Sequence, residues 1–195
     1  MRRPGCRPHA GGPCSPWAAT ERLAEEADGG VVHGLRADLS SLRSVRDLAA
    51  DVETFLDRDH SDALNAVVNS AATVSSRHMT TRDGFELQFV VNHLAPFLLS
   101  ALLLPLMRDG AIVNVTSGSH RRGVIHWNDL QLRRRYSLLR AYEQSKLANL
   151  IVSYELDRRI DRSRGLRCYA FDPGLVDTSL GEKQTSGACR ASRGP

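Results

Sequence analysis

The sequence predicts an α/β domain built on a parallel sheet, and three observations lead to this prediction. Short apolar runs alternate along the chain with longer amphipathic or apolar stretches, as expected for strands joined by crossover helices. The length of 195 residues fits one domain with a sizeable core, so two independent domains are not expected. The apolar content of 42% and the charged content of 25% are ordinary for a soluble globular protein.

Both ends of the chain lack hydrophobic periodicity. Residues 1–19 are punctuated by proline and glycine, and residues 181–195 are small and polar. We therefore expect disordered tails around one partial domain at residues 20–180. The basic start at Met1-Arg2-Arg3 is followed by no apolar stretch, which argues against a signal peptide.

Within the domain, the apolar patterns predict the elements in chain order. The end of a helix is expected at 20–27, a strand at 31–37, an amphipathic helix at 45–56 after a serine cap, a strand at 63–68, a long, mostly buried helix or helix pair at 85–107, and further elements at 111–115 (strand), 140–159 (helix) and 166–171 (strand). The helix at 140–159 shows two stripes. Its expected packing stripe is Leu147, Leu150, Ile151 and Tyr154, and its polar stripe is Tyr142, Lys146, Asn149 and Ser153.

Several classes of protein are disfavoured by composition. The longest apolar run, 97–107, is about half of what spans a bilayer and contains Pro105, so we expect a buried helix and no membrane span. The four cysteines form no C-x-x-C pair, so neither a metal site nor a disulfide framework is indicated, and a reducing cytoplasm is the simplest compartment. The net charge of +4 comes from basic residues interspersed with acidic ones, and the cluster Arg133-Arg134-Arg135 lies in no nucleic-acid-binding motif. We expect this cluster to be a charged surface turn and expect no nucleic-acid partner.

Tyr142 and Lys146 form a Y-x-x-x-K spacing, which on a helix places a phenol and an ammonium on one face. A nearby positive charge favours phenolate, so we expect the pKa of Tyr142 to move from about 10 towards the range useful for acid–base catalysis. Only two of the 26 basic residues are lysines, and a compact point charge on a flexible stem suits this role better than arginine. The spacing alone also fits a surface tyrosine lying over a lysine stem.

Four further segments occur in order along the chain. They are Asn69-Ser70-Ala71-Ala72, Val91-Asn92-His93-Leu94, Asn114-Val115-Thr116-Ser117 and Pro173-Gly174-Leu175-Val176-Asp177-Thr178. Together with the Y-x-x-x-K spacing they resemble the short-chain dehydrogenase/reductase family over residues 20–178. The runs 83–94 and 141–149 are similar to its retinol dehydrogenase-like branch. The resemblance implies a Rossmann-like, doubly wound parallel sheet.

The resemblance also implies an NAD(P)-dependent oxidoreductase that moves hydride between nicotinamide and a small-molecule carbonyl or alcohol. In this chain Tyr142 becomes the proton donor or acceptor, and Lys146 its pKa modifier and a ribose ligand. Ser117 becomes the group that polarises the substrate carbonyl, and Asn92 the holder of a water that passes protons from Lys146 to solvent. The implied cofactor-binding residues are Asp38, Leu39, Asn69, Ala71, Lys146, Pro173, Gly174, Val176 and Thr178. Asp38 also fits a residue that precedes a helix cap, and Pro173-Gly174 also fits an ordinary turn. We expect no catalytic role for His93 or His120.

The sequence departs from the family pattern in two places. Ala72 stands where the family has a glycine, so a methyl group lies where backbone approaches cofactor. The turn T-G-x-x-x-G-x-G, which holds the pyrophosphate, does not occur, and 19 residues before Thr20 are too few for a strand–helix–strand unit. We therefore expect a truncated domain that lacks the first strand–turn–helix unit and the last strand, with NAD or NADP binding weakened or lost.

Two functions are open at this point. The first is the NAD(P)-dependent oxidoreductase, and the second is a catalytically silent fragment that acts at most as an association module through its long helices. Membership of the family would also lead us to expect a homo-oligomer. Neither the substrate nor the choice between NAD and NADP can be read from the residues present.

Overall fold

The computed structural model describes residues 16–27, 30–58 and 63–174, which fall into two units that meet between Arg36 and Ala37. In the first unit, α1 (Pro16–Glu26) begins earlier than the expected domain start at Thr20. The strand predicted at 31–37 is wrong, because residues 30–37 adopt no regular secondary structure. A strand requires backbone partners on a neighbouring strand, and the sheet formed by the described residues contains none for this segment.

The second unit contains all of the remaining described elements. They are α2 (Leu42–Arg58), β1 (Leu64–Asn69), α3 (Leu87–Phe89), the π-helical turn η1 (Val90–Leu94), α4 (Ala95–Leu103), the 3-10 turn η2 (Leu104–Leu106), β2 (Met107–Val115), the 3-10 turn η3 (Gly118–Arg122), α5 (Leu138–Arg159), the 3-10 turn η4 (Arg162–Arg164) and β3 (Arg167–Phe171). The elements predicted at 45–56, 63–68, 111–115, 140–159 and 166–171 all have counterparts here. The helical stretch predicted at 85–107 is broken by η1 into α3 and α4.

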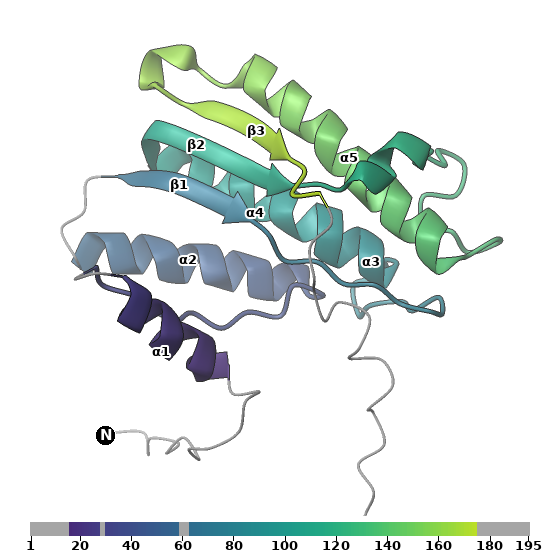
Figure 1. Cartoon of the computed structure of the whole chain (residues 1–195), viewed down its shortest axis with the longest axis horizontal. Coiled ribbons are helices and arrows are strands. Elements are labelled where there is room, and N and C mark those ends of the chain that lie inside the picture. Colours follow the sequence, from purple (N-terminus) through teal and green to yellow (C-terminus); the bar gives the residue numbers. More distant parts are fainter. Residues whose placement is uncertain (1–15, 28–29, 59–62, 175–195) are drawn as a thin grey trace, which may run out of the picture. The chain divides into compact units, whose positions relative to one another are not determined.

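The three described strands form a parallel sheet in the order β1-β2-β3. Figure 1 shows α4 in the connection from β1 to β2 and α5 in the connection from β2 to β3. The strand order and the helical crossovers confirm an α/β parallel-sheet architecture. Gly110 is required for the pairing of β1 with β2, because a Cβ atom there would overlap the backbone oxygen of Asn65.

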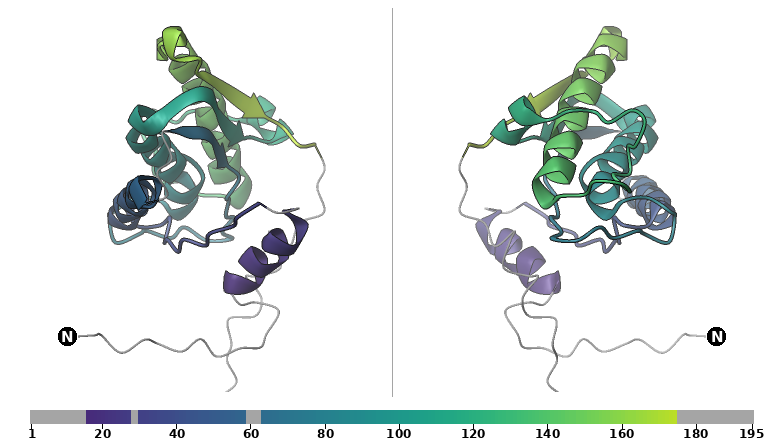
Figure 2. Two further views of the ribbon diagram at one scale, coloured as in Figure 1. Left: turned by 90° about the vertical axis from the view of Figure 1, so that its left-hand side faces the viewer. Right: turned by 90° about the vertical axis from the view of Figure 1, so that its right-hand side faces the viewer.

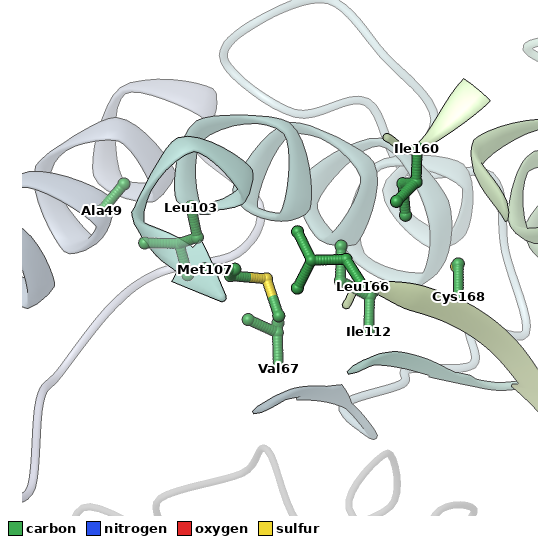
Figure 3. Close-up of a cluster of buried hydrophobic side chains, with 8 residues drawn as sticks. All are labelled: Ala49, Val67, Leu103, Met107, Ile112, Ile160, Leu166 and Cys168. Atoms are coloured by element: carbon green, nitrogen blue, oxygen red, sulfur yellow. The ribbon is translucent and has the colours of Figure 1, made fainter. Parts of the chain in front are cut away.

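One face of the sheet is covered and the other is open within the described residues. The covered face packs on α2, α4 and α5 through a core of Ala49, Val67, Leu103, Met107, Ile112, Ile160, Leu166 and Cys168 (Figure 3). Side chains alternate along a strand, so the opposite face presents Val68, Tyr169 and Phe171, which are 62%, 49% and 54% exposed. Figure 2 shows the sheet and these helices from both sides.

The stripes of α5 are arranged differently from the prediction. Tyr154 and Ile151, expected to pack, are exposed, whereas Asn149 and Ser153 on the polar stripe are buried. The reason is that the polar stripe meets polar groups of η1 and β2 and is satisfied by hydrogen bonds there. Hydrophobicity alone therefore gave the wrong inner face of this helix.

The apolar run Leu87–Leu106 is the one described segment long and apolar enough to cross a bilayer, judged by length and composition. A core helix passes the same test, and this run packs against α2, α5 and the sheet in the second unit. The π-helical turn in its middle carries a buried asparagine and a buried histidine. The window that meets the test is 44% buried, and Phe97 and Leu102 are among its exposed side chains, so the run is only partly the buried helix that the sequence predicts.

Candidate active site

The carboxyl ends of the three parallel strands meet at one edge of the sheet. Asn69 at the end of β1 is in register with Asn114 on β2, and Val115 is in register with Phe171 at the end of β3. Ligands of open α/β sheets bind in the crevice beyond this edge. The residues predicted to carry chemistry lie on these strand ends or on the helices that pack behind them.

Ser117 and Tyr142 are brought together at this edge. Ser117 follows β2 in an extended conformation and caps η3, where its hydroxyl donates to Ser119 Oγ at 3.2 Å, and it lies close enough to the phenol of Tyr142 to lower the pKa of that phenol. Tyr142 lies in the first turns of α5, whose start is fixed by Ser137 accepting a hydrogen bond from the Arg140 amide. Both side chains are half-buried. A phenol and a hydroxyl thus converge on one point beyond the sheet.

Lys146 lies one helical turn after Tyr142, as the spacing predicts. Its Nζ is 5.6 Å from the centroid of the Tyr142 ring and donates a 2.9 Å hydrogen bond to the backbone oxygen of Val115. The side chain is 2% exposed, and burial lowers the pKa of Lys146 to about 8. The protein thus keeps an ammonium in a desolvated position beside the phenol.

The expected downward shift in the pKa of Tyr142 does not occur in this arrangement. Burial raises the pKa of Tyr142, the hydrogen bond from Ser117 partly offsets this, and the carboxylate of Asp172 raises the pKa further. The ammonium of Lys146 interacts with the ring face and is directed to Val115 rather than to the phenol oxygen. The predicted lowering of the Tyr142 pKa is therefore wrong for the chain alone, and the phenol holds its proton more firmly than a free tyrosine does.

Asn92 lies in the π-helical turn and is 1% exposed. Its carboxamide accepts a 2.7 Å hydrogen bond from the Thr73 amide and donates to the Thr73 oxygen at 2.9 Å and to Ser145 Oγ at 3.2 Å. The side chain of Asn92 therefore connects the loop after β1 to Ser145 of α5, the residue that precedes Lys146. A proton relay through water at Asn92 stays a prediction.

A largely buried polar network links the ends of β1 and β2 to the polar stripe of α5. Asn69 Nδ2 donates to Ser100 Oγ at 2.9 Å and to Asn114 Oδ1 at 2.8 Å, and Asn114 Nδ2 donates to Ser153 Oγ at 2.9 Å. Asn69 is thus placed at the edge by side-chain contacts as well as by β1. Its predicted contact with a cofactor is untested by these interactions.

Asn149 continues this network to the π-helical turn. Its Nδ2 donates a 2.6 Å hydrogen bond to the backbone oxygen of Asn92, so its Oδ1 is the atom that accepts from His93 Nδ1 at 2.9 Å. This assigns the Nδ1–H tautomer to His93, and burial lowers the pKa of its imidazole. His93 thus takes part in the hydrogen-bond network between η1 and α5, and the absence of a catalytic role for it stays a prediction.

Asp38 and Leu39 lie at the start of α2. The carboxylate of Asp38 accepts hydrogen bonds from the Ser40 amide at 2.9 Å and from the Ser40 hydroxyl at 2.7 Å, and its amide donates to Ser44 Oγ at 2.8 Å. These bonds lower the pKa of Asp38, the Ser40 hydroxyl most of all. The contacts are those of a residue that begins a helix, and a role for Asp38 or the half-buried Leu39 in binding adenine stays a prediction.

The loop after β3 is described only at its start. Pro173 and Gly174 are exposed, and Gly174 adopts a φ of +73°, where its amide donates to Asp172 Oδ1 at 3.1 Å. Ala71 is exposed after β1. Val176 and Thr178 lie outside the described residues.

Sequence reasoning missed Asp172 near the site, and His120, for which we expected no catalytic role, also lies there. Asp172 influences Tyr142 electrostatically from the end of β3, and His120 Nδ1 contacts the Ser117 oxygen at 2.6 Å. Asp172 directly precedes Pro173-Gly174, which was the available signal. His120 lies three residues after Ser117, where a 3-10 turn brings it back onto the Ser117 carbonyl. Among the described residues, no group of three or more His, Cys, Asp or Glu side chains could hold a metal.

The arrangement can bind an oxygen atom between two donors. A hydroxyl from Ser117 and a phenol from Tyr142 converge, and the high pKa of the phenol keeps its proton in place at neutral pH. The cation of Lys146 lies behind the phenol. Such a site stabilises a carbonyl oxygen as it gains negative charge and can deliver a proton to it.

Comparisons with known proteins agree with this geometry. Over 168 residues the chain is 38% identical to human retinol dehydrogenase 13, covering 84% of this chain and 49% of that protein. It is also 38% identical over 173 residues to polyprenol dehydrogenase from Danio rerio, covering 84% and 51%. The chain therefore spans about half the length of these curated relatives.

Solved structures show the same fold. A crystal structure of an uncharacterized protein from Mycobacterium paratuberculosis superposes with a TM-score of 0.66 at 38% identity, covering 84% of this chain and 59% of that one. The angucycline C-6 ketoreductase LanV with bound NADP superposes with a TM-score of 0.65 at 26% identity, covering 87% and 63%. These neighbours confirm the Rossmann-like α/β fold class. The family model for short chain dehydrogenase matches residues 15–188, and the chain belongs to the short-chain dehydrogenase/reductase family, on its retinol dehydrogenase-like branch.

Proposed function

We propose that this chain carries the catalytic groups of an NAD(P)-dependent oxidoreductase that interconverts a small-molecule carbonyl and its alcohol. The single observation behind this proposal is the proximity of the Ser117 hydroxyl to the Tyr142 phenol, with the buried ammonium of Lys146 against the Tyr142 ring, at the carboxyl edge of the parallel sheet. Retinol dehydrogenase 13 and polyprenol dehydrogenase bear the names of enzymes of apolar alcohols, so we propose an apolar primary alcohol or its aldehyde as the substrate.

The residues fit a nicotinamide cofactor at one end of the site. Lys146 has three N–H groups and gives one to Val115, and Gly174 has no neighbouring atom within 4 Å of where a Cβ would lie. We propose that Lys146, Asn69, Ala71 and the Pro173-Gly174 turn hold the nicotinamide ribose side. The described residues include no glycine-rich turn at a helix start, so we expect weak binding of the pyrophosphate. When bound, the cofactor supplies or accepts the hydride.

The side chains of this chain would then perform the proton chemistry. Ser117 and Tyr142 hydrogen-bond to the substrate oxygen and orient it. As negative charge develops on that oxygen, the phenol transfers its proton, and the positive charge of Lys146 stabilises the phenolate that is left. In the direction of alcohol oxidation the same phenolate accepts the proton. Asp172 opposes phenolate formation and thereby favours the proton-donating form.

A reductase assay with retinal and a set of simpler aldehydes, run with NADH and NADPH in turn, tests the proposal. We expect Tyr142→Phe to lower turnover by at least two orders of magnitude, since general acid catalysis contributes roughly 10²–10⁴-fold. Tyr154→Phe is the matched control, because it removes the same hydroxyl from the same helix at a position that is 71% exposed. Equal turnover in the two variants would remove the proposed mechanism.

The open face of the sheet supports a second candidate function. Parallel sheets are normally covered on both faces, and here Val68, Tyr169 and Phe171 are exposed on one of them. This favours an association module without catalysis. Light scattering and thermal unfolding with and without NADPH separate the two: a rise in melting temperature with NADPH contradicts a silent module, and an oligomer whose melting ignores NADPH supports one.

A further inference from the structure

The segment of residues 121–140 connects the two ends of the candidate site, because it runs from just after Ser117 to just before Tyr142 (Figure 1). We name it the basic loop. It carries six arginines and one acidic residue, Asp129. The whole chain has 26 basic and 22 acidic residues, so the remainder has 20 and 21. The positive charge of this protein is therefore concentrated in the basic loop.

Three arginines of the loop are available for a partner, whereas Arg122 pairs with Glu143. Arg133, Arg134 and Arg135 are exposed, and no salt bridge within residues 16–27, 30–58 and 63–174 engages them. The carboxylate of Asp129 accepts hydrogen bonds from the backbone amides of Arg133 and Arg134 at 2.9 and 3.1 Å. The one acid in the loop thus shapes the turn through backbone amides and forms no salt bridge with these guanidinium groups.

Large apolar side chains are exposed in the same loop. Trp127 is 77% exposed, and Val124 and Leu139 are 59% and 58% exposed. Arg140 connects the tryptophan turn to the arginine turn, since its guanidinium contacts His126 Nε2 at 3.1 Å and donates to the Arg135 oxygen at 2.9 Å. Exposed apolar groups and unpaired arginines therefore belong to one locally connected structure.

We propose that the basic loop docks this protein on the surface of an anionic lipid bilayer. Phosphate and carboxylate headgroups complement the guanidinium groups, and a tryptophan with aliphatic neighbours is suited to the boundary between headgroups and acyl chains. A nucleic acid would match the charge but would leave Val124 and Leu139 exposed to water. Docking would place the site between Ser117 and Tyr142 next to the layer in which an apolar alcohol or aldehyde dissolves, and this last step rests on the proposed function.

Co-sedimentation of the purified chain with vesicles tests the docking without cofactor or substrate. The vesicles contain phosphatidylcholine alone or with about a third phosphatidylserine, and we expect salt-sensitive binding to the second kind. Replacing Arg133, Arg134 and Arg135 together by alanine should weaken the partition constant by about 100-fold, at about five-fold or 1 kcal/mol per arginine. Trp127→Ser should weaken it by about five- to ten-fold through lost apolar burial.

The matched control removes three positive charges elsewhere. Arg158 and Arg159 are exposed at the C-terminal end of α5, and Arg162 is exposed at the start of η4. Each pairs with Glu155 or Asp157. Their joint replacement by alanine should therefore change vesicle binding by less than about three-fold. Equal losses in the two triple variants would overturn the proposal, because net charge alone would then be responsible. Binding to single-stranded RNA in place of vesicles, or vesicle binding that Trp127→Ser leaves unchanged, would also overturn it.

The vesicle-binding result can be distinguished from the result of the reductase assay. Tyr142→Phe should sediment with vesicles like the unsubstituted chain, whatever its turnover. Loss of turnover with intact vesicle binding supports both proposals, and intact turnover without vesicle binding refutes the docking alone. The arginine and tryptophan variants lie on exposed positions, and a thermal melt of every variant confirms that the fold is retained.

Discussion

Replacing Lys146 by methionine should stabilise the folded chain while removing its proposed catalytic function. Burial lowers the pKa of Lys146 from 10.5 to about 8, so the folded state binds fewer protons than the unfolded state between these two values. The free-energy cost of keeping this ammonium buried is therefore complete below pH 8 and disappears as the pH rises towards 10.5. Methionine has a similar shape and carries no charge, so it removes this cost.

The shift sets the size of the effect. At 1.36 kcal/mol per pKa unit, the cost is about 3 kcal/mol at pH 7 and about 1 kcal/mol at pH 9.5. Losing the hydrogen bond from Nζ to the Val115 oxygen removes about 1 kcal/mol of stability at both values. We therefore expect Lys146→Met to be more stable by about 2 kcal/mol at pH 7 and about equal to the original chain at pH 9.5.

Urea unfolding at the two pH values measures this difference. Taking the difference between the two chains cancels the titration of all other groups that behave alike in both. Leu147→Met is the control, since it introduces the same residue at the next position of α5 and changes no charge, so its effect should be independent of pH. A stability difference for Lys146→Met that stays constant from pH 7 to pH 9.5 would refute the reasoning, because the buried ammonium would then not be the cause.

Three further predictions concern the core, the phenol and the thiol. Leu166→Ala should lower the free energy of unfolding in urea by roughly 3 kcal/mol, because Leu166 is 2% exposed in the core cluster. Val68→Ala, at a 62% exposed position, should lower it by less than about 1 kcal/mol. Similar losses in the two variants would contradict the assigned core. Asp172→Asn should lower the pKa of Tyr142, because it removes a carboxylate that opposes the phenolate. An ultraviolet titration of phenolate absorbance, with the Tyr142→Phe signal subtracted, measures this pKa. An unchanged pKa would show that Asp172 does not act on Tyr142. Burial raises the pKa of the Cys168 thiol to about 11, so alkylation at pH 8, followed by peptide mass spectrometry, should be far slower in the folded chain than in urea; equal rates would show that the thiol is accessible.

The arrangement of the candidate catalytic residues was predictable because it depends on local spacing. Tyr142 and Lys146 are four residues apart, and any α-helix places such a pair on one face. Ser117 and Asn69 follow apolar runs that can only be buried strands, and the ends of parallel strands meet at one edge. The position of each of these residues is therefore set by a few neighbours in the chain.

The failures of sequence reasoning share a different cause. The segment 31–37 has the pattern of a strand, yet a strand exists only where another strand offers its backbone. Ile151 is apolar and is exposed, whereas Asn149 is polar and is buried, because the deciding contact is with Asn92 on a segment far away in the chain. Hydropathy describes a residue and cannot report which partner it meets.

The sequence by itself determined the alternation of strands and helices, the family pattern and the identity of the phenol, the ammonium and the hydroxyl. Only the tertiary structure decided the protonation of the site: it buried Tyr142, directed Lys146 to the Val115 oxygen and brought Asp172 from the end of β3 close enough to raise the pKa of the phenol. The physical reason is that spacing along one helix fixes which side chains share a face, whereas a pKa depends on solvent exclusion and on charges carried by segments that are remote in sequence.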